Sequence, residues 1–119
     1  MDQKDHNWTK SPSQLGLSSR RIHAIKLAAA LRAGRSTLGL SQTAFARKIG
    51  ISKSKLARAE TAVGSFNSDD LEAALRFFRD YGVIVDLLSQ DEVTVRVTPE
   101  GIEKLDALFI SEAPAGEDS

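Results

Sequence analysis

The pattern of apolar and polar positions predicts a series of amphipathic helices over the first two thirds of the chain. The longest begins near Ser18, and its apolar residues recur at the three- and four-residue spacing of a helix. Either Ser18 or Ser19 can cap its first turn, because a serine hydroxyl accepts a hydrogen bond from an amide that lacks a helical partner. We expect this helix to bury one apolar face, made of Ile22, Ile25, Ala29, Leu31 and Leu38.

Capping residues predict three further helices. Ser41 is the expected N-cap of a helix over Gln42–Ile49, and Ser52 is the expected N-cap of the helix after it. Gly50 separates these two short helices, because glycine takes a positive φ without a steric penalty. The fourth helix begins at Ser68, and its expected core positions are Leu71, Ala74, Leu75 and Phe78.

The period of the pattern changes after Gly82. The runs VIVDLL at 83–88 and VTVRVT at 93–98 are rich in β-branched residues and predict two strands joined by the turn SQDE. Thr98, Pro99 and Glu100 then fit the N-cap and first two positions of a final helix. The apolar side of this helix is expected to be Ile102, Leu105, Leu108 and Phe109. The sequence therefore predicts a helical domain over 18–82 and a hairpin with a helix over 83–111.

The two ends of the chain lack this periodicity. Residues 1–17 mix Pro, Ser, Gly, Asn and charged residues, so we predict a flexible N-terminal arm. Trp8 stands out within it; we favour its packing against the domain, with a contact to a partner as the alternative. Residues 112–119 are acidic and small, which is typical of a disordered tail.

Composition argues against most catalytic chemistry. The chain has no cysteine, which excludes thiolate catalysis and disulfides. Its two histidines, His6 and His23, are far apart in the sequence, and no Gly-rich phosphate loop is present. We therefore expect neither an enzyme nor a metal or cofactor site. No apolar run reaches the length of a membrane span, and no secretory signal is visible, so we expect a cytoplasmic protein without a membrane partner.

Charge is distributed unevenly along a chain whose formal net charge is zero. Residues 18–61 contain ten Lys and Arg against a single Glu, whereas residues 62–119 contain four against thirteen Asp and Glu. A basic half joined to an acidic half favours a surface that binds a polyanion and a second module with another role.

The two short helices supply a specific geometry for that surface. Two helices joined by a glycine-containing turn, the second of them basic, form a helix-turn-helix arrangement, whose second helix enters the major groove of DNA. Four residues of that second helix share one face and are expected to contact base edges: Lys53, Ser54, Ala57 and Arg58. Arg58 has the planar fork that suits guanine O6 and N7. Lys48 is expected to lie near phosphates.

These residues also resemble a known family. LGLSQ at 38–42, FA at 45–46, IGIS at 49–52, Leu56 and Glu60 are similar to the phage repressor and Cro-like helix-turn-helix family, also called the xenobiotic-response-element type. The similarity covers about residues 20–82. It implies a mainly α, lambda-repressor-like domain of four to five helices, followed in this chain by the β-hairpin and the C-terminal helix.

The resemblance also implies residue roles. Gln42 corresponds to a glutamine that contacts the DNA backbone and braces the recognition helix, and Ser41 and Lys55 correspond to phosphate-contacting positions. Ser52, at the start of the recognition helix, is assigned to the DNA backbone as well. Arg35 and Glu60 correspond to a structural ion pair between the first and third helices. One departure is that Ala62 and Val63 stand where glycine is frequent in the family.

The sequence is compatible with two functions. The first is a sequence-specific regulator that binds double-stranded DNA, acting as a repressor and a homodimer on a palindromic operator. VIVDLL alternates too little to face water; the last helix is expected to cover one face of the hairpin, and a second copy of the hairpin is the simplest cover for the rest. The alternative is an autoregulatory antitoxin-type protein that binds both DNA and a protein partner.

Overall fold

The structure, a computed structural model, describes residues 10–111. Trp8 and the 112–119 tail lie outside these residues, as does most of the predicted arm; its described end contains a short 3-10 helix, η2 (Ser13–Leu15). Four α-helices follow: α1 (Ser19–Thr37), α2 (Gln42–Ile49), α3 (Lys53–Ala59) and α4 (Ser68–Asp80). The hairpin strands β1 (Val83–Asp86) and β2 (Thr94–Val97) lead into α5 (Pro99–Ser111). The predicted fold class, a helix-turn-helix domain with a hairpin and a final helix, is confirmed.

Side-chain caps begin the first four helices. The side chains of Ser18, Ser41, Ser52 and Asn67 each accept a hydrogen bond from the amide three residues later. Each cap satisfies one of the amides that the first helical turn leaves without a partner. The serine caps predicted from the sequence are therefore correct, and Ser18 rather than Ser19 caps α1.

Aromatic rings occupy the centre of the core. Phe45 of α2 stacks on Phe78 of α4 with ring centroids 5.0 Å apart and an interplanar angle of 14°. Gly34 of α1 lets the Phe78 ring approach the helix backbone, since a Cβ at Gly34 would lie within 2.7 Å of three ring atoms. Leu31 and Leu56 are fully buried beside the rings. Helices α1 to α4 therefore share one hydrophobic core.

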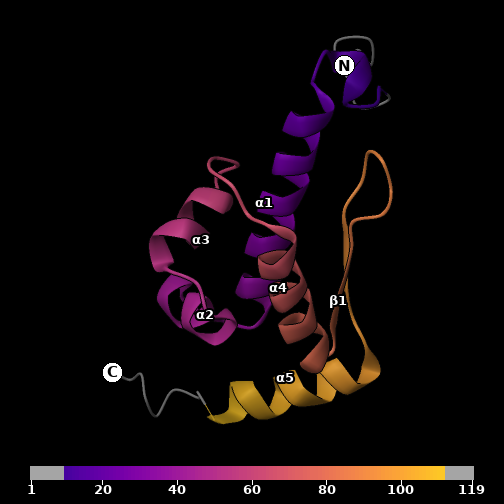
Figure 1. Cartoon of the computed structure of the whole chain (residues 1–119). Helices are drawn as coiled ribbons and strands as arrows, with labels where there is room; N and C mark the ends of the chain where they lie inside the picture. The colour runs from indigo at the N-terminus through magenta and orange to yellow at the C-terminus, as the bar shows by residue number, and fades with distance from the viewer. Residues whose placement is uncertain (1–9, 112–119) are drawn as a thin grey trace, which may run out of the picture.

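The buried face of α1 differs from the predicted one. Leu31 and Leu38 are buried as expected, but Ile25 is exposed and Ile22 is only partly buried. The exposed Ala29 was also wrongly assigned to the core; the other buried positions of α1 are Leu27, Ala28, Ala30 and Gly34. The physical reason at the start of the helix is that the first two turns of α1 extend past α3 and α4, so the core begins at Leu27 (Figure 1). Ala29 lies on the side of α1 that faces away from this core, between the buried Ala28 and Ala30.

The hairpin is shorter than predicted. Its strands pair antiparallel over four residues each, with Val83 opposite Val97 and Asp86 opposite Thr94. Residues 87–93 form the connection, in place of the four-residue SQDE turn. The Lys26 ammonium of α1 donates hydrogen bonds to the backbone carbonyls of Leu87 and Ser89. These carbonyls therefore bond to α1 instead of extending the strand ladder.

The apolar side of the hairpin is covered by the chain itself. Val83 is fully buried in the core, and Val85 and Val95 pack against it. The hairpin lies against α1 and α4 on the side opposite to α2 and α3 (Figure 1). Helices α1 and α4 therefore supply cover that the sequence led us to expect from a second copy of the hairpin, and self-association of the chain stays a prediction.

Uncovered apolar surface is found on α5 instead. Thr98 caps this helix by accepting a hydrogen bond from the amide of Gly101 at 3.0 Å, as its sequence predicts. Helix α5 lies across the end of the domain (Figure 1) and leaves three large apolar side chains largely exposed. They are Ile102, Phe109 and Ile110, at 61%, 57% and 66%.

Candidate nucleic-acid interface

The turn between α2 and α3 sets the direction of the second helix. Gly50 takes a φ of 80°, and its amide donates to the carbonyls of α2. The amide of Ile51 donates back to the carbonyl of Ala46 at 3.0 Å. Ser52 then begins α3 at once, with its hydroxyl 3.1 Å from the amide of Lys55. The two helices are therefore joined by a short connection held by hydrogen bonds.

A carboxylate cluster ties α3 to the two helices before it. Glu60, which caps the C-terminal end of α3, is only 2% exposed. Arg35 of α1 donates to both of its oxygens, from Nε to Oε2 at 2.7 Å and from Nη2 to Oε1 at 2.9 Å. The side-chain amide of Gln42, in α2, donates from Nε2 to the same Oε1 at 2.9 Å. The third nitrogen of Arg35, Nη1, donates to the Leu40 carbonyl at 2.9 Å.

This cluster has an electrostatic consequence for the surface. Glu60 is the single acidic residue in residues 18–61, and its charge is buried against a guanidinium. An ion pair has no net charge, so Glu60 offsets Arg35 rather than the cations on α3. The outer side of α3 therefore presents positive charge, and no exposed acid from residues 18–61 offsets it.

The predicted base-contacting residues lie on the outer side of α3. Lys53 and Ser54 are exposed in its first turn and Arg58 is exposed in its last turn. Ala57 lies between them and is partly buried. The structure thus brings all four onto one accessible helix face, and their contacts with DNA remain a prediction.

The residues predicted to contact the DNA backbone differ from one another in how their side chains are already bonded. Ser41 and Ser52 use their hydroxyl oxygens to cap helices, which leaves each hydroxyl hydrogen free to donate elsewhere. Lys48 is exposed in the last turn of α2. The Lys55 ammonium forms an ion pair with Asp70 in the first turn of α4, so it is directed away from the α3 face.

The Lys55–Asp70 ion pair and the Gln42–Glu60 hydrogen bond were not foreseen. Asp70 has an ordinary explanation in the sequence, since a carboxylate in the first turn of a helix is favoured by the helix dipole. Nothing in the sequence indicates that it also meets a lysine of α3. Both contacts join residues that are 15 or more positions apart, and only the packing of helices reveals them.

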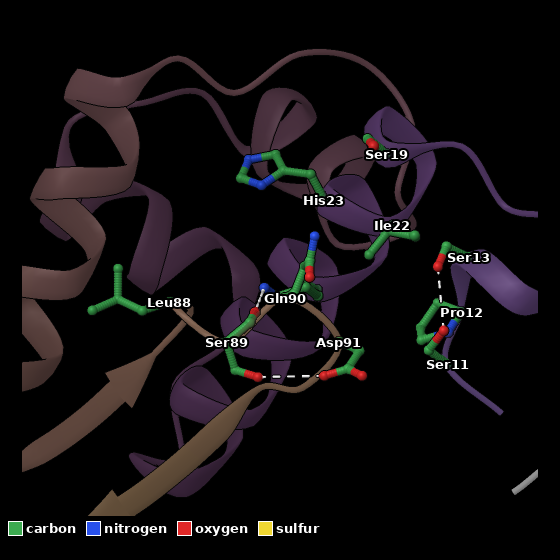
Figure 2. A pocket seen from close by; sticks show the side chains of 11 residues that line it. Ser11, Pro12, Ser13, Ser19, Ile22, His23, Leu88, Ser89, Gln90 and Asp91 are labelled. Carbon is green, nitrogen blue, oxygen red and sulfur yellow. Dashed lines mark hydrogen bonds between the residues drawn. The ribbon is translucent and has the colours of Figure 1, made fainter. Parts of the chain in front are cut away.

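A separate hollow lies between the start of α1 and the hairpin connection. Its volume is about 300 Å³, and Figure 2 shows His23 of α1 facing it together with Gln90 and Asp91 of the connection. The Ser89 hydroxyl donates to Asp91 at 3.4 Å. Because the hairpin and α3 lie on opposite sides of α1, this hollow contributes nothing to the α3 face (Figure 1).

In residues 10–111, no helix combines the length and the apolar character needed to cross a membrane. The same part of the chain gathers no three His, Cys, Asp or Glu side chains in a position to hold a metal ion.

Comparison with known proteins agrees with the geometry of α2 and α3. Residues 26–83 match the family model described as a helix-turn-helix domain, which spans α2, α3 and α4 in full. No curated protein and no solved structure shows a significant match to the chain. Helix-turn-helix domains bind DNA by placing the second helix in the major groove. Residues 26–83 of this chain are therefore a helix-turn-helix domain, consistent with the phage repressor and Cro-like type that the sequence resembles.

Proposed function

We propose that this protein is a sequence-specific regulator of transcription that binds double-stranded DNA as a dimer and represses a promoter. The observation that carries the proposal is the outer face of α3. It presents Lys53, Ser54 and Arg58 to solvent, while the acid of the same segment, Glu60, is buried and paired. A protein of this kind acts in the compartment that holds the DNA, which for a bacterial member is the cytoplasm.

In this proposal α3 lies in the major groove and reads bases through its exposed residues. The guanidinium of Arg58 donates two parallel hydrogen bonds to O6 and N7 of a guanine. Lys53 donates to the same acceptors with less geometric constraint. Ser54 can donate or accept, and the Ala57 methyl fits against a thymine methyl.

Residues around the turn hold the duplex in register. Ser41, Gln42, Ser52 and Lys48 are proposed to contact phosphates on either side of the groove, and such contacts fix orientation without reading sequence. Each phosphate that a cation neutralises releases counterions, which makes affinity fall as salt rises. Lys55 is expected to contribute less, because its ammonium must leave Asp70 before it meets a phosphate.

The proposed dimer rests on α5. Three large apolar side chains of this helix, Ile102, Phe109 and Ile110, face solvent, and an apolar surface of this kind marks an interaction site. A second copy can cover it by the same surface under two-fold symmetry. Two-fold pairing would set the two α3 helices about one DNA turn apart, roughly 34–36 Å, and so require a near-palindromic site.

The same surface is also the observation that favours the second candidate function. A partner protein could cover α5 in place of a second copy, as in an autoregulatory antitoxin-type protein. Sedimentation of the full-length chain separates the two. A dimer at micromolar concentration that becomes a monomer in Phe109→Asp supports self-association, whereas a wild-type monomer, with and without DNA, contradicts it. Leu88→Asp is the control, since Leu88 is 94% exposed on the hairpin connection.

Selection from random duplex DNA tests the DNA-binding proposal. The full-length chain is expected to enrich a near-palindromic sequence. Arg58→Ala should weaken binding to that sequence by about 1–3 kcal/mol and relax the preference at one base pair in each half-site. Arg96→Ala removes the same charge from the exposed side of β2 and should leave the preference intact. If Arg58→Ala weakened binding to all sequences equally, Arg58 would not read a base.

A further inference from the structure

The segment after α3 folds back over the last turn of that helix. The carbonyl of Arg58 accepts hydrogen bonds from this segment: from the Thr61 amide at 3.1 Å and the Val63 amide at 2.8 Å, with the Thr61 hydroxyl also 3.1 Å away. Ala62, between these donors, takes a φ of 60°, which reverses the chain. The reversal brings the backbone of Gly64 beside the side chain of Arg58.

This returning segment is anchored from a second side. Arg21 of α1 donates from Nη1 to the carbonyl of Ala62 at 2.7 Å. The two residues are 41 positions apart, so the bond joins the segment to the first helix of the fold, which precedes α2 and α3 in the chain. The turn formed by residues 61–64 is therefore held both to α3 and to α1.

A side chain at Gly64 would meet the side chain of Arg58. A Cβ placed at Gly64 would lie 2.8 Å from Nε of Arg58, 3.3 Å from its Cβ and 3.4 Å from its Nη2. The backbone of Gly64 thus lines one side of the Arg58 guanidinium, at a distance that only glycine permits. Gly64 also has a φ of 79°, so this position favours glycine both for its backbone conformation and for its lack of a side chain.

We propose that Gly64 is a positioning residue for DNA recognition, because its bare backbone holds the Arg58 guanidinium in the orientation that reads a base. This inference rests on the proposed function. An arginine side chain loses much rotational freedom when it binds, and a side chain that is already restrained loses less on binding. Arg58 is exposed, so the restraint comes from the turn after α3 and not from burial in the core.

A substitution at Gly64 should therefore move Arg58 rather than the backbone. Nε of Arg58, the nearest atom to the new Cβ, lies far out on a flexible side chain that can rotate away, whereas the contact with the Arg58 Cβ at 3.3 Å requires a shift of only a few tenths of an ångström. Gly64→Ala should weaken binding to the selected DNA by roughly 2- to 10-fold, the factor expected when one long side chain must be ordered on binding. It should also relax the preference at the same base pair that Arg58→Ala affects.

A double-mutant cycle in the full-length chain tests the proposal. Affinity and base preference are measured for wild type, Gly64→Ala, Arg58→Ala and the double variant, each per folded molecule. The proposal expects Gly64→Ala to weaken binding when Arg58 is present and to have no effect in the Arg58→Ala background. An equal factor in both backgrounds would mean that the added methyl group obstructs DNA directly, and it would overturn the proposal.

Two controls separate this effect from a loss of folding. Gly39→Ala places alanine at a φ of 69° in open space, so it measures the cost of backbone strain without a contact. The melting temperatures of Gly39→Ala and Gly64→Ala should fall by similar amounts. Gly64→Asn adds the same Cβ and tolerates the left-handed conformation better, so it replaces Gly64→Ala if that variant does not fold.

The cycle also distinguishes the failure of this inference from that of the proposed function. A wild-type chain that binds no duplex DNA refutes both. A chain that binds DNA selectively, while Gly64→Ala and Gly64→Asn leave affinity and base preference unchanged, refutes only the role of Gly64.

Discussion

Glu60→Gln is the substitution that most directly tests how the helix-turn-helix unit is held together. The change keeps the shape of the side chain and removes its charge. In the structure the carboxylate accepts three hydrogen bonds, two from Arg35 and one from Gln42. A glutamine offers only one acceptor oxygen, so at least the Arg35 Nε donor would face an NH2 group.

The expected cost follows from these contacts. A hydrogen bond to a charged group contributes about 1.5–3 kcal/mol, and a neutral one about 0.5–1.5 kcal/mol. Breaking a fully buried ion pair costs about 3–5 kcal/mol. The Arg35 side chain, however, is 21% exposed, so water can solvate part of its charge. We therefore expect Glu60→Gln to lower the free energy of unfolding by about 2–4 kcal/mol. For a domain of this size that corresponds to a fall in melting temperature of roughly 10–20 °C.

Urea unfolding followed by circular dichroism measures this difference in the full-length chain. Glu72→Gln is the matched control, because Glu72 forms an exposed ion pair with Arg76 on α4 at 3.5 Å. That pair is expected to contribute only about 0.3–0.5 kcal/mol. DNA affinity, measured at a temperature where every variant is folded, should change far less than stability. Should the two variants unfold at the same urea concentration while Glu60→Gln alone loses DNA binding, Glu60 would belong to the binding surface.

Three further substitutions test other parts of the structure by the same unfolding measurement. Ala62→Gly should raise stability by up to about 1 kcal/mol, because Ala62 takes a φ of 60° and glycine removes the cost of that conformation; a lower midpoint would contradict it. Gly34→Ala should lower stability by about 1–3 kcal/mol, because its Cβ would overlap the Phe78 ring, and an unchanged midpoint would mean that the ring can move aside. Lys26→Met should change the free energy of unfolding by less than about 1 kcal/mol but speed amide exchange in the hairpin connection, whose carbonyls Lys26 binds; unchanged exchange would show that other contacts hold the connection.

The sequence alone determined the order and type of the elements and most of their starting points. Ser41, Ser52 and Thr98 cap the helices that their positions predicted, and the change of period after Gly82 marks the start of the strands. These features depend on residues within three or four positions of one another. A cap or a turn is chosen by local chemistry, and local chemistry can be seen in a linear pattern. For the same reason the recognisable spacing of 38–60 was enough to identify the helix-turn-helix arrangement.

Tertiary structure decided which surfaces face one another. The apolar run VIVDLL, with its lack of polar alternation, predicted that the hairpin needs cover, but it did not indicate that α1 and α4 supply it. Nor could periodicity choose the buried side of α1, because the alanine-rich sequence at 28–30 is compatible with more than one face. The Lys55–Asp70 pair, the Gln42 contact with Glu60 and the place of Gly64 beside Arg58 likewise depend on how helices and turns pack. A sequence pattern indicates whether a side chain is buried, exposed or needs a hydrogen-bond partner. Which residue it contacts depends on the three-dimensional arrangement of elements that are distant in the chain.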